Sequence, residues 1–276
     1  MRQAPVAVLG GLAAGYVHAA SPFDDELGRL RLLEDRYDAR TFGRLSALGP
    51  LAGTVCLEVG AGAGSVARWL AAQAGPAGRV VATDADPRFL AGAATAGIEV
   101  RRHDILAGQL EPGRYDLVHC RALLCHLADP LRALRTMAAA LRPGGWLLVE
   151  DADYVSLVAA DPAHPRSARF DAIMGKLLEF IAASRAFDPF FGRGLPSLVA
   201  AAGLAEPRCE AIACHRQGGS GTAELLRRSL ERTRDGVLGH GLLDADEFEA
   251  VLAATRDPSF SFVDALSIAA WGRSPG

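Results

Sequence analysis

A short apolar run followed by a glycine-rich turn constrains this chain more than any other feature. Residues 55–59 are apolar except for Glu58, and three glycines follow at alternate positions. An apolar run of this length is typical of a parallel strand that is buried on both faces. Side chains at Gly60 and Gly62 would block the approach of the backbone to a ligand. The segment therefore predicts a strand, a tight turn and a helix over 64–74 that together bind a nucleoside.

The N-terminus of the helix expected over 64–74 would add an anion-binding site next to this turn. Free N–H groups and the positive end of the helix dipole would face the crevice. Such an end can bind a pyrophosphate or the carboxylate of an amino acid. Dinucleotide-binding turns usually follow G-x-G-x-x-G, whereas Ser65 occupies the position of the third glycine here. The spacing of the glycines therefore favours a ligand with a single nucleoside over a dinucleotide.

Two nearby aspartates compete for a role beside the nucleoside. Asp84 ends a second apolar run, twenty residues after Gly64. A carboxylate in this place can accept charge-assisted hydrogen bonds from both hydroxyls of a ribose. Asp86 is only two residues further on, but it precedes Pro87 and is expected to cap a helix. We therefore prefer Asp84 as the ribose ligand.

The order of these motifs along the chain resembles that of the class I S-adenosylmethionine (SAM) dependent methyltransferases. The resemblance covers roughly residues 30–155, and the C-terminal part more loosely. The matching segments are L-E-V-G-A-G-A-G-S at 57–65, V-V-A-T-D at 80–84, H-D-I at 103–105, Y-D-L-V-H-C-R at 115–121 and L-R-P-G-G-W-L-L-V-E-D at 141–151.

The resemblance implies that SAM is the cofactor and that S-adenosylhomocysteine is the product. The glycine turn would lie beside the methionine part of SAM. Asp104 would accept a hydrogen bond from the adenine amino group, and Ile105 would pack on the ring. The expected cofactor contacts are Tyr16, Glu58, Gly60, Ala61, Gly62, Asp84, Ala85, His103, Asp104, Ile105, Cys120 and Arg121.

Three of these residues have a structural interpretation beside the functional one. A carboxylate within a buried strand needs a partner, so Glu58 either braces the glycine turn or contacts the amino group of SAM through it. Arg121 either lies beside the methionine part of SAM or pairs with an acid such as Glu58 or Asp151. Tyr16, in the N-terminal arm, either helps to enclose the sulfonium or anchors the arm.

His126 is the candidate catalytic residue. It follows the fourth predicted strand, in a segment that borders the acceptor pocket, and imidazole titrates near neutral pH. The alternative is a structural histidine in the turn at 123–127. A base is required only if the acceptor is a weakly acidic hydroxyl, a protonated amine or a carbon acid. The residues expected to line the acceptor pocket are Asp151, Tyr154, His164, Phe187, Phe190 and Phe191.

Alternating strand and helix patterns predict an α/β fold with a doubly wound, mostly parallel sheet. With the resemblance, seven strands are expected, the last one antiparallel. Residues 1–50 are predicted to form an N-terminal arm and helical cap, and residues 51–276 the SAM-binding domain, with inserted lid helices near 155–195 and 220–258. The expected strands lie near 54–59, 79–83, 98–102, 115–119, 146–151, 207–215 and 261–272, and the helices between the first five near 64–74, 87–96 and 130–141.

Composition limits the partners. The 276 residues carry a net charge of −3 and no basic run with interleaved aromatics, so no nucleic-acid partner is expected. The five cysteines contain no C-x-x-C pair, which favours neither a metal site nor a disulfide framework and fits a reducing cytoplasm.

The N-terminal run 4–20 lacks the apolar core of a membrane span. We expect a cytoplasmic protein with no membrane partner, and a homodimer is one assembly that the inserted helices could support.

The function expected from these observations is methyl transfer from SAM to an O, N or C nucleophile of a small-molecule acceptor, such as a natural-product intermediate of secondary metabolism. One alternative is a related protein that uses SAM without transferring its methyl group, in a cyclisation or decarboxylation. An NAD-dependent oxidoreductase is less favoured, because the only lysine, Lys176, has Ala172 rather than a tyrosine four residues before it.

Overall fold

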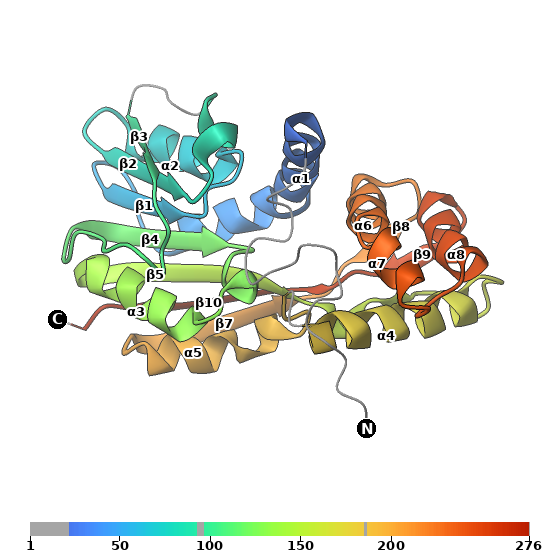
Figure 1. Ribbon diagram of the computed structural model, residues 1–276. Helices are drawn as coiled ribbons and strands as arrows, with labels where there is room; N and C mark the ends of the chain where they lie inside the picture. The colour runs from blue at the N-terminus through green and yellow to red at the C-terminus, as the bar shows by residue number, and fades with distance from the viewer. Residues whose placement is uncertain (1–21, 93–96, 185–186, 276) are drawn as a thin grey trace.

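The computed structural model describes residues 22–92, 97–184 and 187–275. Seven of its strands form one sheet in the order β3-β2-β1-β4-β5-β10-β7 (Figure 1). Strands β1 to β5 pair in parallel, whereas β10 runs antiparallel to β5 and β7. This arrangement confirms the predicted sheet with an antiparallel last strand. The strands are β1 Val55–Val59, β2 Arg79–Asp84, β3 Ile98–Arg102, β4 Tyr115–Arg121, β5 Leu141–Asp153, β7 Ala205–Ile212 and β10 Leu266–Arg273.

Helices cover both faces of this sheet, because successive side chains of each strand point to opposite faces. In β1, Cys56 belongs to an apolar cluster with Leu70 of α2. Its neighbour Leu57 belongs to a second cluster with Leu134 of α3 and Val199 of α5. The helices are α1 Phe23–Ala47, α2 Ser65–Ala74, α3 Pro130–Ala140 and α5 Leu195–Ala201.

A smaller lobe lies at one end of the sheet (Figure 1). Its three strands follow the order β6-β9-β8, and it has an apolar core of its own around Phe170, Phe248 and Phe262. The elements of this lobe are β6 Val158–Ala159, β8 His215–Gln217, β9 Ser261–Val263, α4 Ser167–Ser184, α6 Gly221–Glu231, α7 Arg234–Gly239 and α8 Ala245–Arg256. Helix α1 packs against both α2 and α6 and so connects the two lobes.

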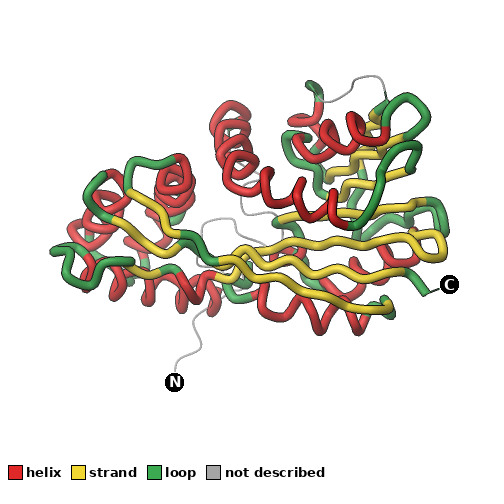
Figure 2. Tube along the Cα trace, turned by 180° about the vertical axis from the view of Figure 1, so that it is seen from behind, coloured by secondary structure: helices red, strands yellow, loops and turns green. Residues whose placement is uncertain are grey.

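Two expected strands are each divided between the sheets. The run near 207–215 becomes β7 and β8, and the run near 261–272 becomes β9 and β10. The chain leaves the large sheet between these pairs, where Asp264 N donates to Cys214 O over 2.7 Å. Figure 2 shows from the opposite side how long strands of the large sheet lead into the smaller lobe. An apolar pattern records burial but does not say in which sheet a residue is buried.

Short 3₁₀ helices replace parts of the expected helices and loops. The helix expected over 87–96 is the single turn η1 Pro87–Leu90 as far as the described residues extend. The others are η2 Leu124–His126, η3 Tyr154–Ser156 and η4 Phe191–Gly194. None of the helices in the described part of the chain is long and apolar enough to cross a bilayer.

Candidate functional site

A cavity of about 650 Å³ lies at the carboxyl ends of β1, β2, β4 and β5. In an open α/β sheet this edge is the usual place for a ligand, where the strand order reverses. One half of the cavity is lined by the glycine turn and the residues that follow β2 and β3. The other half is lined by the ends of β4 and β5 together with α1, α4 and α6. We refer to these as the sheet half and the lobe half.

The glycine turn is held against the end of β2 by its own backbone. Gly60 N and Ala61 N both donate to Thr83 O, over 2.8 and 3.0 Å. Gly60 has φ +70° and Gly62 has φ +56°, a left-handed conformation that residues with a Cβ adopt only with strain. A Cβ on Gly60 would also lie 3.2 Å from the side chain of Leu123. Glycine is therefore required here by both conformation and space.

Asp84 links this turn to the end of β2. Its carboxylate accepts from Gly62 N and from Asp86 N, each over 2.9 Å. Burial raises the pKa of Asp84, and these backbone hydrogen bonds oppose the rise. Asp86 also lines the cavity, but it caps η1 and pairs with Arg88. Asp84 is thus bound to the glycine turn, whereas Asp86 caps a helix as its position before Pro87 predicted.

The start of α2 differs from the expectation of free N–H groups. Ser65 N donates to Glu34 Oε1 over 2.9 Å, and Ser65 Oγ donates to Asp38 Oδ1 over 2.9 Å. Both acids come from α1. A carboxylate at a helix N-terminus is favourable for the helix dipole, so α1 already supplies the negative charge that a ligand was expected to bring.

The residues after β3 line the far end of the sheet half. Ile105 is buried, whereas Asp104 is exposed and accepts from Leu106 N over 2.9 Å. His103 Nε2 is a buried polar atom with no hydrogen-bond partner among the described residues. A buried polar atom of this kind costs free energy unless a partner is supplied. This end of the cavity therefore suits a flat ligand with polar edges.

Glu58 and Arg121 line the cavity but have protein partners. His119 Nδ1 lies 2.7 Å from Glu58 Oε2, and both side chains are buried. Burial raises the pKa of Glu58, and His119 opposes the rise. Arg121 donates to Thr41 Oγ1 and Asp38 Oδ1, each over 2.8 Å, rather than to the acids expected from the sequence. Both residues thus brace the site while facing it.

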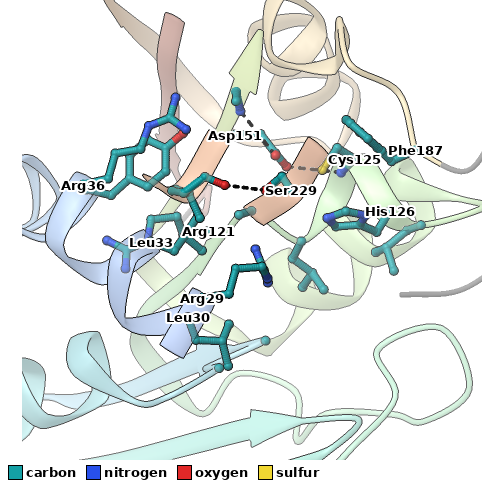
Figure 3. A pocket seen from close by; sticks show the side chains of 18 of the residues that line it. Arg29, Leu30, Leu33, Arg36, Arg121, Cys125, His126, Asp151, Phe187 and Ser229 are labelled. Atoms are coloured by element: carbon teal, nitrogen blue, oxygen red, sulfur yellow. Dashed lines mark hydrogen bonds between the residues drawn. The ribbon is translucent and has the colours of Figure 1, made fainter. Parts of the chain in front are cut away.

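The lobe half contains His126, Asp151 and Phe187 (Figure 3). Tyr154 also lines it. The ring centroid of Phe187 lies 5.7 Å from the ring centroid of His126 and 6.2 Å from that of Tyr154. Burial, together with the charge of Arg29, lowers the pKa of His126 to about 4. Burial raises the pKa of Asp151 to about 6. Both shifts favour the neutral form of a buried group.

Four residues expected at the site do not line this cavity. Cys120 is fully buried in an apolar cluster on one face of the sheet. Phe191 is in the same cluster, and Phe190 packs under the guanidinium of Arg193. His164 lies 5.4 Å from the ring of Phe260 in the smaller lobe. Residue 16, also expected at the site, lies outside the described residues.

The sequence interpretation missed the side chains that helices contribute to the cavity. Their apolar spacing in the sequence predicts a helix but not which cavity the helix borders. The missed residues include Arg29, Leu30, Leu33, Glu34, Arg36 and Tyr37 of α1, Met174, Leu178 and Ile181 of α4, Leu225, Leu226, Ser229 and Leu230 of α6, and Phe89, Leu123, Cys125, Thr233 and Asp264 elsewhere.

Comparisons with known sequences agree with this geometry. The chain matches the family model described as a methyltransferase domain over residues 29–205. It is 36% identical over 89 residues to methyltransferase str3 of Strobilurus tenacellus. The aligned segment covers 32% of this chain and 30% of the relative. It is 46% identical over 37 residues to the ubiquinone biosynthesis O-methyltransferase of Bordetella pertussis, 13% of this chain and 15% of the relative. The chain thus spans less than a third of the length of these curated relatives.

Solved structures share the fold at low sequence identity. The YcgJ protein of Bacillus subtilis superposes with a TM-score of 0.56 at 16% identity, over 86% of this chain and 99% of that chain. Phosphoethanolamine N-methyltransferase 2 of Haemonchus contortus, in complex with phosphomonomethylethanolamine and S-adenosylhomocysteine, superposes with a TM-score of 0.52 at 16% identity, over 84% of this chain and 51% of that chain. The likeness concerns the architecture of the sheet and its flanking helices.

Proposed function

The chain belongs to the methyltransferase-domain family, among the class I SAM-dependent methyltransferases, and from this premise we propose that it transfers the methyl group of SAM to a nucleophile of a small-molecule acceptor. The observation that carries the proposal is the pairing of two unlike halves in one cavity. The sheet half has the polar acceptors and glycine turn suited to an adenosine, and the lobe half is largely apolar.

The residues of the sheet half fit SAM. Asp84 retains lone pairs for the ribose hydroxyls beyond the two backbone bonds that it accepts. The buried Nε2 of His103 and the exposed carboxylate of Asp104 can meet polar edges of the adenine, with Ile105 on its face. The turn at Gly60 would approach the methionine part. Tyr16 remains a prediction for the segment outside the described residues.

SAM supplies a methyl group that is already activated by the sulfonium charge. The chain therefore has to align the acceptor with this methyl group and exclude water, rather than generate a reactive group. The acceptor would enter the lobe half, between α1, α4 and α6. We infer that the apolar walls from Met174, Leu178 and Leu225 favour a compact acceptor with an apolar body.

The division into parts follows from the same assignment. We propose that residues 51–276 form the SAM-binding domain and that residues 1–50 cap it. We propose that the smaller lobe contains the substrate-side insertions predicted near 155–195 and 220–258. A cavity of about 650 Å³ suits a small natural-product intermediate better than a macromolecule. A homodimer remains a prediction.

Calorimetry with S-adenosylhomocysteine and with NAD tests the cofactor assignment. We expect S-adenosylhomocysteine to bind and NAD not to bind. Asp84→Asn should weaken S-adenosylhomocysteine binding about 10- to 100-fold, since hydrogen bonds to a charged group contribute about 1.5–3 kcal/mol.

The matched control for this variant is Asp86→Asn. Asp86 lines the same cavity but is engaged with Arg88, so the affinity should change by less than about threefold. NAD binding without S-adenosylhomocysteine binding would refute the proposed function. Equal losses in the two variants would refute the assignment of Asp84 to the ribose.

A further inference from the structure

Six carboxylate side chains in the described part of the chain are buried. Five of them have a basic partner at short distance. The pairs are Glu26 with Arg29 and Arg232, Glu58 with His119, Glu150 with Arg44, Asp153 with Arg193, and Asp264 with Arg36. Asp151 is the sixth, and no basic side chain of the described residues pairs with it.

The bonds that Asp151 does accept compensate poorly for its burial. Cys125 N donates to Oδ2 over 3.2 Å, and Ala152 N donates to Oδ1 over 3.3 Å. Both lengths lie at or beyond the long end of the usual range for N–H···O bonds. Burial and the carboxylate raise the pKa of the neighbouring Cys125 thiol and keep it protonated, so it adds a hydrogen bond to Asp151, but a thiol is only a weak donor.

The position of Asp151 shows where a partner would come from. It lies near the end of β5 and lines the lobe half of the cavity, beside Cys125 and near His126 and Phe187 (Figure 3). A buried carboxylate without a cation is costly to keep. A hydrogen-bond donor that enters the lobe half would satisfy it, and the apolar walls would surround the rest of that molecule.

We propose that Asp151 receives the hydroxyl hydrogen of the acceptor and takes up its proton during methylation, and that the acceptor is an apolar ring compound bearing that hydroxyl. The proposal rests on the proposed function. As the acceptor oxygen forms its bond to the methyl carbon, its O–H bond breaks and the proton passes to the Asp151 carboxylate. The carbon–sulfur bond of the donor breaks, and its electron pair remains on the sulfur as a neutral thioether.

The chemistry of the base favours a hydroxyl over other nucleophiles. An aminium group beside Asp151 would keep its proton, because a carboxylic acid is a much stronger acid than an aminium ion, and no lone pair would remain for attack. A carbon acid is a poor hydrogen-bond donor to a buried carboxylate, and it has no lone pair for attack while it keeps its proton. A hydroxyl retains lone pairs while it donates to the carboxylate.

The surroundings of the carboxylate also favour Asp151 over His126 as the base. A general base works best when its pKa lies near the working pH. Burial raises the pKa of Asp151 to about 6. Burial and Arg29 lower that of His126 to about 4. A neutral His126 can still hydrogen-bond the acceptor and orient it.

Binding of two ring compounds of equal shape tests the recognition of the hydroxyl. Calorimetry would compare 4-methylphenol with 1,4-dimethylbenzene in the presence of S-adenosylhomocysteine. We expect 4-methylphenol to bind about 10- to 100-fold tighter to the native protein, as for a hydrogen bond to a charged group. Asp151→Asn should reduce this preference to within about threefold and leave binding of 1,4-dimethylbenzene unchanged.

Asp153→Asn is the matched control. It removes a buried carboxylate two residues away on the same strand, but one that pairs with Arg193 and does not line the cavity. The preference for 4-methylphenol should survive in this variant.

A second test needs no variant. In the native protein the preference for 4-methylphenol should fall as the pH drops below about 6 and Asp151 becomes protonated. Equal binding of the two compounds, or a preference that survives Asp151→Asn, overturns the proposal.

Transfer of labelled methyl groups tests the uptake of the proton. With 4-methylphenol, Asp151→Asn should lower the rate about 10²- to 10⁴-fold, the usual contribution of a general base. The loss should be smaller with 4-nitrophenol, which ionises readily by itself. Equal losses with both phenols, or transfer to neither by native protein that binds both, would contradict the role of Asp151.

Binding of S-adenosylhomocysteine separates this proposal from the proposed function. If that ligand does not bind the native protein, the proposed function fails. If it binds and the protein shows no preference for the hydroxyl, only the assignment of Asp151 fails.

Discussion

At the scale of single residues, burial favours the neutral form of several acids of the cavity and of His126. Asp151 and Asp153 lie two positions apart on β5 and differ in this respect. Burial raises the pKa of Asp151 to about 6. Burial also acts on Asp153, but its hydrogen bonds with Arg193 and Val155 N outweigh it and lower the pKa. The difference comes from the contacts of Asp153 with Arg193 and Val155 N, and no local pattern in the sequence shows that Arg193 reaches Asp153 rather than Asp151.

Asp151→Asn should make the protein more stable at neutral and alkaline pH. The pKa of Asp151 is higher in the folded protein than in the unfolded chain, so the protonated carboxyl group favours the folded state. This contribution to stability is complete below the unfolded-state value of 3.8 and is lost as the pH rises through about 6. The variant lacks this loss, so its free energy of unfolding should exceed that of native protein by about 2–3 kcal/mol at high pH. Urea unfolding between pH 8 and pH 4 should show the difference shrink as the pH falls.

Asp153→Asn should behave in the opposite way. Its lowered pKa contributes stability above the unfolded-state value, and this is lost as the pH falls through the folded-state value. Replacement should therefore destabilise the protein at pH 8. A stabilising effect of both variants, or of neither, would contradict the difference in pairing.

At the scale of elements, α1 is more than the cap that its apolar spacing predicts. Its polar side chains reach several separate elements: Glu34 accepts from the start of α2, Arg44 pairs with Glu150 of β5, and Arg36 pairs with Asp264 between β9 and β10. The amphipathic pattern at Leu30 and Tyr37 identifies the helix. The contacts of its charged face depend on packing against elements far away in the chain.

Arg44→Met should strongly destabilise the contact between α1 and the sheet. The two side chains of the pair are buried, with Arg44 Nη1 3.0 Å from Glu150 Oε1. Removal of the guanidinium leaves a buried carboxylate with Thr41 Oγ1 as its remaining side-chain donor among the described residues, so we expect a loss of about 3–5 kcal/mol in urea unfolding. Arg256→Met is the control, since its ion pairs are exposed and should contribute less than about 1 kcal/mol. Comparable losses would show that burial does not decide the strength of the α1 contact.

The turn between β1 and α2 could be predicted from its glycines because their requirement is local. Gly60→Ala places a side chain at φ +70° and against Leu123. We expect a loss of about 1–2 kcal/mol in the free energy of unfolding from the backbone conformation, together with weaker S-adenosylhomocysteine binding. Thermal unfolding and calorimetry measure the two effects.

The control for the turn is Gly175→Ala on α4. That glycine is exposed, and nothing lies within 4 Å of an added Cβ. Alanine in a helix interior should stabilise by about 0.5–1 kcal/mol relative to glycine. A loss of stability there, or tolerance at Gly60, would contradict the conformational explanation.

At the scale of the whole molecule, two lobes with separate apolar cores share one cavity. The clusters around Leu134 and Leu70 belong to the sheet, and the cluster around Phe170 belongs to the smaller lobe. The sequence interpretation expected inserted helices in this region but not a second sheet, because β6, β8 and β9 span only two or three residues each. Strands that short carry no period that could reveal them.

Phe170→Ala should loosen the smaller lobe and leave the sheet intact. Truncation of a buried phenylalanine costs about 3–5 kcal/mol, and Phe170 is only 2% exposed in the core of that lobe. Hydrogen exchange should show lost protection in α4 and α8 but not in β1 or β4, with S-adenosylhomocysteine affinity changed by less than about threefold. Leu148→Ala in the sheet is the comparison, and it should lower protection throughout. Loss of cofactor affinity in Phe170→Ala would contradict the independence of the two cores.

The sequence by itself determined the doubly wound sheet, the glycine turn, and the place of Asp84 at the end of β2. Strand periodicity, turn glycines and an acid at a strand end are all set by residues close together in the chain. Only the tertiary structure decided that acids of α1 bind the start of α2, that Cys120 and His164 do not line the cavity, and that Asp151 is buried with no cation among the described residues. Pairing and burial depend on which distant segments pack together, and no local pattern in the sequence specifies that.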